Sequence, residues 1–222
     1  MRFIRLTEHD VDDVMKFILA DIEAAKPLMK SLALERDDAR LFFEDLLNEA
    51  VNSGVSFIVR TDDHEIVAAR LSTFRTREEA FRDARHIPYH NLTTRLERAK
   101  SVLWHLNQQF WNEASPDINK VYYLMAVVVD PHYRYTDMVD KLVHYNMDEL
   151  RTVDAHGLLA NAAIFHNEML LHRLGYRVVA ETNSSPNTSE GQLHRHDDGV
   201  KKAQLVFKEM WRDENLETHI VI

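Results

Sequence analysis

Cysteine is absent from the 222 residues, which excludes disulfide bonds, a thiolate nucleophile and thiolate metal sites. Basic residues are fewer than acidic ones: the sequence has 27 Lys and Arg and 36 Asp and Glu, which gives a net charge of −9 at pH 7. A surface that binds nucleic acid or an anionic membrane needs a basic stripe, so we expect neither partner. The sequence also lacks an apolar run that could span a bilayer and the apolar core of a signal peptide. We therefore expect a cytoplasmic protein whose ligands are small and neutral or cationic.

The chain also lacks internal repeats, low-complexity tracts and any linker that would divide it. Its length suffices for one domain with a sizeable core or for two small ones. Without a dividing segment, we predict a single domain over residues 1–222.

The first half of the sequence predicts two helices followed by a hairpin. A capping-box pattern, Thr7-Glu-His-Asp10, precedes apolar residues at helical spacing, and Gly54 is typical of a helix end. The Asp pair in Thr61-Asp-Asp-His64 suits a tight turn between β-branched strands, and a polar stretch follows the hairpin through Asn91. The predicted elements are a strand at 3–6, helices at about 11–22 and 37–53, strands at 55–60 and 65–74, and a helix from about residue 92 that Pro116 closes.

Strands and helices alternate in the second half. Residues 121–129 are almost wholly apolar, as expected of a strand buried on both faces. The predicted elements are strands at 121–129, 157–162, 176–182 and 203–211, helices at 139–150 and 167–174, and an exposed loop at 183–200. Together with the first half they predict a mixed α/β fold with a central sheet of about six or seven strands.

The sequence of residues 127–142 predicts a buried strand, a turn that contains proline, and the start of a helix. Unpaired N–H groups and the dipole at a helix N-terminus favour an anion, so this order is typical of a phosphate-binding turn. Yet the segment contains no glycine, which such turns usually need for close approach of the backbone.

The order of elements, together with Val127-Val-Val-Asp-Pro-His-Tyr-Arg134 and Leu174-Gly-Tyr176, resembles the GNAT acyl-CoA N-acyltransferase superfamily. Within it the chain looks most like insect and nematode arylalkylamine N-acetyltransferases, because Pro27-Leu-Met-Lys-Ser-Leu32 matches their Pro-Leu-x-x-Ser-Leu core. The resemblance implies a mostly antiparallel sheet with helices on both faces and a splay between strands 121–129 and 157–162. It also implies transfer of the acyl group of acetyl-CoA, or of a longer acyl-CoA, to a small-molecule amine or other acyl acceptor.

The same resemblance implies where acetyl-CoA would bind. The backbone near Val127, Val128 and Val129 would bond the pantetheine arm, and the following turn would wrap the pyrophosphate. Two positions depart from the family pattern, because Asp137 replaces a glycine and Val139 replaces a glycine or alanine. The turn residues implied in cofactor binding are Arg134, Tyr135, Thr136, Asp137, Met138 and Val139.

Asp137 has two interpretations. A carboxylate ~4 Å from a pyrophosphate oxygen would repel it by about 4 kcal/mol at an effective dielectric near 20, roughly a thousandfold in affinity. Alternatively, Asp137 and Asp140 form a helix N-cap pattern in which the dipole favours the negative charge. In that case the protein supplies the anion itself.

The catalytic positions implied by the family also differ. Lys26 stands where the insect enzymes have a glutamate base, Ala163 and Asn167 replace two serines, and Leu171 replaces a tyrosine acid. We predict substitutes by position. His166 and Glu181 are the candidate bases, and Tyr123 is a candidate hydroxyl donor, although each has an ordinary structural explanation.

Two further features leave alternatives open. The cluster His194-Arg-His-Asp-Asp198 contains metal-ligand residue types, but its spacing matches no known closed site, so we predict a solvated loop and no metal. The apolar series from Leu92 to Trp111 is a core-facing helix or part of a homodimer surface. Two functions are weighed evenly: a GNAT-like N-acyltransferase, or a GNAT-fold binding module that has lost the acyl-transfer site.

Overall fold

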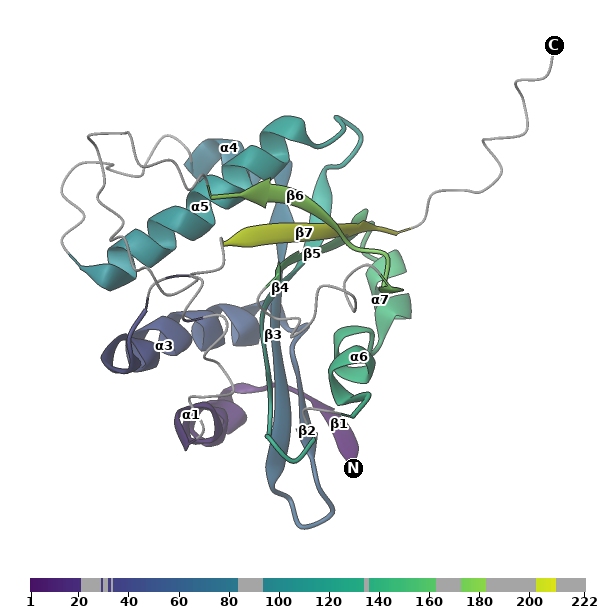
Figure 1. Ribbon diagram of the computed structural model, residues 1–222. Helices are drawn as coiled ribbons and strands as arrows, with labels where there is room; N and C mark the ends of the chain where they lie inside the picture. The colour runs from purple at the N-terminus through teal and green to yellow at the C-terminus, as the bar shows by residue number, and fades with distance from the viewer. Residues whose placement is uncertain are drawn as a thin grey trace.

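A seven-stranded sheet in the order β1-β2-β3-β4-β5-β7-β6 separates two layers of helices in the computed structural model (Figure 1). The structure describes residues 1–20, 29, 32, 34–83, 94–133, 136–162, 173–182 and 203–210. Neighbouring strands pair antiparallel except β4 and β5, which are parallel. This confirms the predicted fold class and strand number. The strands are β1 (Arg2–Arg5), β2 (Phe57–Arg60), β3 (Ile66–Thr76), β4 (Lys120–Val129), β5 (Gly157–Asn161), β6 (Arg177–Glu181) and β7 (Gln204–Glu209).

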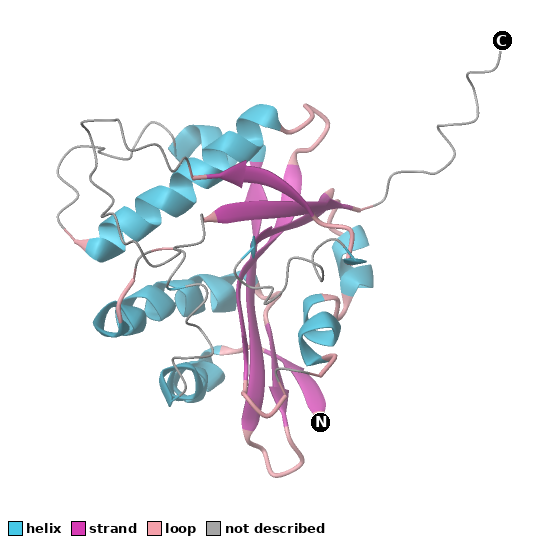
Figure 2. Ribbon diagram, in the orientation of Figure 1, coloured by secondary structure: helices cyan, strands magenta, loops and turns pink. Residues whose placement is uncertain are grey.

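Helices cover both faces of this sheet (Figure 2). One layer consists of η1 (Glu8–Asp10), α1 (Val11–Ala20), α3 (Arg36–Ser53), α4 (Arg77–Asp83) and α5 (Arg95–Glu113). The other consists of α6 (Met138–Val143) and α7 (Met147–Arg151). None of these helices is both long enough and apolar enough to cross a membrane.

Local signals in the sequence set several of these boundaries. The Thr7 backbone N–H donates to Asp10 Oδ2 at 3.0 Å, which confirms the predicted capping box ahead of α1. Gly54 adopts a left-handed conformation (φ 66°) at the end of α3, where glycine has no steric cost. The Thr61 N–H bonds to the Glu65 carbonyl at 2.9 Å and closes the predicted β2–β3 hairpin.

The predictions missed one helix and joined two others into one. The polar stretch after β3 contains α4, which begins at a cap where the Glu79 N–H donates to Thr76 Oγ1 at 3.2 Å. This helix is only partly buried, so it lacks the apolar periodicity that would reveal it. The single helix predicted at 139–150 is two helices, α6 and α7, because Asn146 between them takes a left-handed conformation (φ 58°). The predicted helix at 167–174 and loop at 183–200 lie almost wholly outside the described residues.

Arg70 on β3 connects the sheet to the end of α6. Its side chain is only 2% exposed, and its Nη1 donates to the carbonyls of Leu142 (2.9 Å), Val143 (3.1 Å) and Tyr145 (2.9 Å). These carbonyls belong to the last turn of α6 and the residues after it, where a helix leaves its acceptors unpaired. The guanidinium also lies 4.9 Å from the ring centroid of Phe57. One buried cation therefore satisfies the helix end and holds α6 against β3.

Replacement of Arg70 by methionine should lower the free energy of unfolding by about 3 kcal/mol or more. The substitution keeps an apolar stem but removes a donor from the buried Leu142 and Val143 carbonyls and from the part-buried Tyr145 carbonyl, and the loss of a buried hydrogen bond costs about 1–3 kcal/mol. Chemical denaturation measures the change. Arg98→Met, at an exposed position of α5, is the matched control and should change stability by less than about 0.5 kcal/mol. Equal losses in both variants would contradict the role of Arg70.

Candidate functional site

A β-bulge in β4 divides this strand into two parts. In the register with β3, Leu71 pairs with Ala126 and Ser72 pairs with Leu124, so Met125 has no partner on β3. The alternation of side chains shifts at the same place, because Met125 and Ala126 both pack into the core beneath α1, α3 and α5. A bulge of this kind bends the strand and increases its twist.

Strands β4 and β5 separate at this bulge. They pair in parallel only at Tyr122 with Leu158, Tyr123 with Leu159 and Leu124 with Ala160. Beyond Leu124, β4 continues to Val129 and pairs with β3 alone among the described strands. The splay implied by the resemblance is therefore present beside the C-terminal half of β4, since β5 ends at Asn161, one residue after its last pair with β4.

The hydrogen-bond pattern decides which backbone groups of β4 face the splay. The Asp130 N–H donates to the Val67 carbonyl at 2.9 Å, and in an antiparallel pair every second residue uses both of its backbone groups on the same neighbour. By this alternation, Val128 bonds to Ala69 on β3. Val127 and Val129 direct their N–H and C=O groups away from β3, toward the splay. An edge of this kind can pair with an extended ligand that carries amides.

The turn after β4 leads into the N-terminus of α6. Thr136 caps this helix, because its Oγ1 accepts a hydrogen bond from the Met138 N–H at 3.2 Å and donates to the Tyr133 carbonyl at 2.6 Å. Asp137 occupies the N-cap position but makes no side-chain hydrogen bond to the helix. Its carboxylate instead pairs with Lys141 Nζ at 2.8 Å, and both side chains are exposed. Asp137 therefore stands at the N-cap, as one of its two interpretations expected, but the side-chain hydrogen bond of the cap comes from Thr136.

The next two predicted turn residues point into the protein. Met138 and Val139 are buried between α6 and the sheet, among the residues of the second core. A valine at this position packs against the sheet, which explains why the chain does not use a glycine or alanine there.

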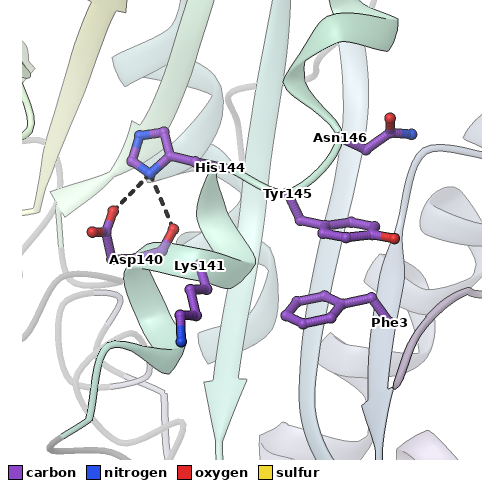
Figure 3. A pocket seen from close by; sticks show the side chains of 6 residues that line it. All are labelled: Phe3, Asp140, Lys141, His144, Tyr145 and Asn146. Atoms are coloured by element: carbon purple, nitrogen blue, oxygen red, sulfur yellow. Dashed lines mark hydrogen bonds and ion pairs between the residues drawn. The ribbon is translucent and has the colours of Figure 1, made fainter. Parts of the chain in front are cut away.

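Three carboxylates belong to this turn and to α6, and each has a basic partner in the same segment. Asp130 Oδ1 lies 2.8 Å from His132 Nδ1, Asp137 pairs with Lys141, and Asp140 Oδ1 lies 2.9 Å from His144 Nδ1. Figure 3 shows Asp140, Lys141 and His144 beside the stacked rings of Phe3 and Tyr145. These groups line an open depression of about 400 Å³.

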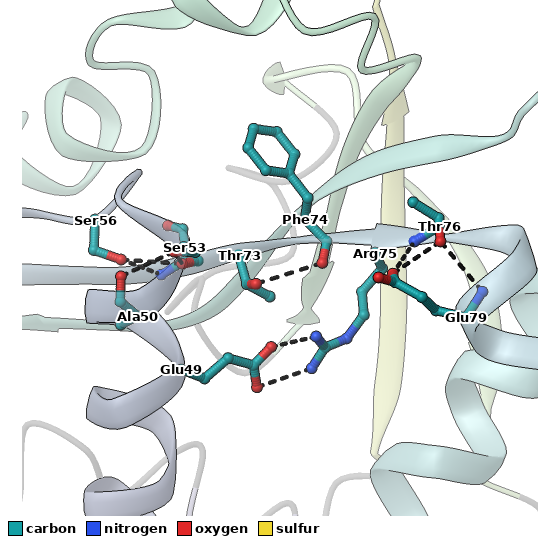
Figure 4. Close-up of polar contacts among 10 residues, drawn as sticks. Glu49, Ala50, Ser53, Ser56, Thr73, Phe74, Arg75, Thr76 and Glu79 are labelled. Atoms are coloured by element: carbon teal, nitrogen blue, oxygen red, sulfur yellow. Dashed lines mark hydrogen bonds and ion pairs between the residues drawn. The ribbon is translucent and has the colours of Figure 1, made fainter. Parts of the chain in front are cut away.

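The opposite face of the sheet carries a polar cluster around Tyr123. Arg75 donates to both carboxylate oxygens of Glu49, with Nη2 3.0 Å from Oε2 (Figure 4). Its guanidinium carbon lies 5.6 Å from the centroid of the Tyr123 ring. Burial raises the pKa of the Tyr123 hydroxyl, while Arg75 and the side chain of Asn107 oppose that rise. Tyr123 is therefore a protonated, buried phenol one residue before the last β4–β5 pair.

The strand order keeps two of the predicted catalytic residues, Tyr123 and Glu181, apart. Glu181 lies on the outermost strand, β6, where its Oε2 accepts a hydrogen bond from Gln204 Nε2 at 3.1 Å. Tyr123 lies on β4, three strand spacings or roughly 14 Å away. No group of three His, Asp or Glu side chains within the described ranges could hold a metal ion. The predicted site residues that fall outside the described part are Lys26, Arg134, Tyr135, Ala163, His166, Asn167, Leu171 and His194 to Asp198.

Sequence reasoning missed several residues of this site. The Asp137–Lys141 pair was readable, because residues four apart are neighbours on a helix. Glu49 and Arg75 are 26 positions apart, and nothing in the sequence signals their pairing. The bulge at Met125 depends on the register with β3, so it too has no local signal.

Hydrogen exchange tests which amides face the splay. In the free protein, the Val128 amide should exchange at least about tenfold more slowly than those of Val127 and Val129, because only Val128 donates to β3. The exchange of Ala69, the partner of Val128, is the internal control and should also be slow. Residue-resolved NMR measures these rates. Equal protection of Val127, Val128 and Val129 would mean that the edge of β4 is already covered.

Comparisons with known proteins agree with this geometry at the level of the fold. No protein-family model and no curated protein matches the sequence. Among solved structures, the polyamine N-acetyltransferase of Drosophila melanogaster, which forms N-acetylagmatine, superposes with a TM-score of 0.77 at 16% identity over 94% of this chain and 99% of that one. An agmatine N-acetyltransferase gives a TM-score of 0.73 at 16% identity, with 94% and 99% covered.

Arylalkylamine N-acetyltransferase 2 of Aedes aegypti gives a TM-score of 0.70 at 16% identity, over 94% of this chain and 98% of that one. At 16% identity these superpositions show that the fold is shared, and the activity must be argued from the site. The expectation of a GNAT fold is confirmed: this chain has the fold of the GNAT N-acetyltransferases, as expected from its resemblance to the arylalkylamine branch.

Proposed function

We propose that the protein transfers an acyl group from a pantetheine thioester, of which acetyl-CoA is the familiar example, to the nitrogen of a small amine. The observation that carries this proposal is the splay, where the edge of β4 offers the backbone groups of Val127 and Val129. The buried hydroxyl-bearing side chain of Tyr123 lies on the same strand, just before the strands separate.

The backbone edge suits the arm of the donor. A pantetheine arm is extended and contains two amide groups, so it can pair with a strand edge as an added strand would. Val127 and Val129 supply such an edge without any particular side chain. This explains how the arm can be recognised although the family's side-chain pattern is altered elsewhere.

Tyr123 is proposed as the acid of the reaction. The amine nitrogen forms a bond to the thioester carbon, the carbon–sulfur bond breaks, the amine gives up a proton and the sulfur receives one. The Tyr123 hydroxyl is protonated at neutral pH and is proposed to donate its proton to the sulfur; burial raises the pKa of this hydroxyl, and Arg75 opposes that rise and so favours the donation. Arg75, fixed by Glu49, holds the ring in place. His166 is proposed as the base for the amine, and Glu181, on β6, lies too far from Tyr123 to act together with it.

A cationic amine is the acceptor that the charge favours. The net charge of −9 attracts cations and raises their concentration near the surface. Two of the similar structures are named for agmatine or polyamine acetylation, and both of those acceptors are cationic amines. We propose the same class of acceptor for this chain.

Two features of the turn before α6 favour a different function. The turn at the N-terminus of α6 holds an exposed carboxylate, Asp137, and the Met138 N–H already bonds to Thr136. Both features weaken an anion site. A GNAT-fold binding module that uses the splay without acyl transfer is therefore the second candidate.

Tyr123→Phe should lower kcat for acetyl transfer by about a hundredfold, because general acid catalysis typically contributes a factor of this size. A panel of small amines with acetyl-CoA and acetyl-pantetheine as donors measures the rate. Tyr122→Phe is the matched control. Its hydroxyl donates to the Val55 carbonyl at 2.9 Å on the other face of the sheet, so it should alter stability and leave kcat unchanged. Full kcat in Tyr123→Phe would contradict the assigned role.

The two candidate functions are separated by product formation and by thermal stability. A transferase gives N-acetylated amine, and a donor at 100 times its Kd stabilises the fold by about 2.7 kcal/mol. If neither donor yields product with any amine or raises the melting temperature at millimolar concentration, the transferase proposal is wrong.

A further inference from the structure

We propose that the side-chain amide of Asn161, at the end of β5, binds the carbonyl oxygen of the acyl thioester and stabilises the negative charge that this oxygen acquires during transfer. Asn161 is thus a second catalytic residue beside Tyr123. This inference rests on the proposed function, because it concerns the same thioester in the same splay.

Asn161 lies where β4 and β5 part. It is the last residue of β5, and the residue before it, Ala160, makes the last parallel pair with Leu124 of β4. On its other side Asn161 pairs with Leu205 of β7. The sheet is therefore continuous toward β7 and open toward β4 at this residue, so Asn161 borders the base of the splay.

The side chain of Asn161 is on the same face of the sheet as that of Tyr123. Residues two apart on a strand share a face, so Asn161 shares a face with Leu159, which belongs to the core beneath α1, α3 and α5. Tyr123 pairs with Leu159 and packs in the same core. One strand spacing and two residues along the strand separate Tyr123 from Asn161, which places their Cα atoms roughly 8 Å apart.

Asn161 places an amide in apolar surroundings. Its side chain is 1% exposed. In the same row of the sheet, the neighbouring strands contribute Met125 and Ala126 of β4 and Leu205 of β7, and all three belong to the apolar core. Asparagine has a low preference for strands, and moving an amide out of water costs free energy that an apolar side chain does not lose. A leucine or valine would suit the core better, so the amide points to a role in binding.

An amide can bond to the protein and to a thioester at the same time. It carries two N–H donors and an oxygen with two lone pairs, and Asn161 takes part in an interaction within the protein. A contact of this kind limits the rotation of the amide before a substrate binds. Donors that are oriented in advance stabilise a developing charge most effectively. Since a carbonyl oxygen only accepts hydrogen bonds, the N–H of the amide is the group that binds it.

The role of Asn161 follows the movement of charge during transfer. The amine nitrogen forms a bond to the thioester carbon, and one electron pair of the carbonyl moves onto its oxygen, which becomes negative. The Asn161 N–H donates to this oxygen. The carbonyl forms again as the carbon–sulfur bond breaks, the amine gives up a proton to the base, and the sulfur receives a proton from Tyr123. Asn161 and Tyr123 therefore act on neighbouring atoms of one group, which agrees with their position on one face.

Asn161→Ala should lower kcat by about a hundredfold to a thousandfold, which is the usual effect of removing one such donor, and leave both KM values nearly unchanged. Asn161→Asp replaces the N–H donors by oxygen at nearly the same volume, so its kcat should fall at least as far. Asn161→Ser keeps a donor and should be more active than Asn161→Asp. Steady-state kinetics with acetyl-CoA and acetyl-pantetheine as donors measures these changes.

Ser56→Ala is the matched control. It removes another buried hydrogen bond, from Ser56 Oγ to the Ser72 carbonyl at 3.0 Å, and should lower the melting temperature without changing kcat. A parental kcat in Asn161→Ala would overturn the inference. So would an Asn161→Asp variant as active as the parent, because the amide oxygen would then be the group in use. If Asn161→Ala does not fold, the order of Asn161→Ser and Asn161→Asp decides: equal or reversed activities overturn the inference.

Infrared spectroscopy of a bound acetyl thioester, isotopically labelled at its carbonyl carbon, separates this inference from the proposed function. A hydrogen bond from Asn161 lowers the stretching frequency of the carbonyl, so the band should lie at a lower frequency in the unaltered protein than in Asn161→Ala. This difference without transfer to any amine supports the inference for a binding module and overturns the transferase. Transfer with equal bands and equal kcat in both proteins overturns the role of Asn161 and leaves the N-acyltransferase standing. If neither acetyl thioester binds at millimolar concentration, both proposals are wrong.

Discussion

The separation of β4 from β5 at the Met125 bulge is the constraint on which the rest of the structure depends. A central pair of strands ordinarily satisfies its backbone groups within the sheet, and an unpaired edge in the middle of a sheet carries a cost unless something pairs with it. The bulge shifts β4 so that Val127 and Val129 face outward while Val128 stays bonded to β3. The binding edge thus arises from the backbone, which is why it survives alongside altered side chains.

Arg70 lies on the side of β4 away from the splay and supports the strand there. It lies on β3 directly across from Val127 and holds the carbonyl end of α6 through buried hydrogen bonds. The position of α6, and with it the turn that contains Asp137, is therefore coupled to the strand that forms the edge. The buried Arg70 guanidinium and the packed Val139 side chain both oppose a movement of α6 relative to β3 and β4.

Much of the fold could be predicted from local patterns, and most of the site could not. The apolar run of β4, the stop at Gly54 and the capping box at Thr7 act over a few residues and were visible in the sequence. The choice between Val127 and Val128 depends on the pairing register with β3, which is a tertiary property. Asp137 shows that local patterns can also mislead about individual hydrogen bonds. Its position at the helix start was predicted correctly, but the Met138 N–H bonds to Thr136 instead.

Binding of an acyl donor's arm along the splayed edge of β4 is the proposal on which the others depend. A crystal structure with a non-reactive ketone analogue of acetyl-pantetheine would reveal such binding directly. We expect hydrogen bonds from the amides of the arm to the backbone of Val127 and Val129, with the acyl end near Tyr123. An analogue bound elsewhere, with the edge of β4 covered by the protein's own chain, would contradict this proposal.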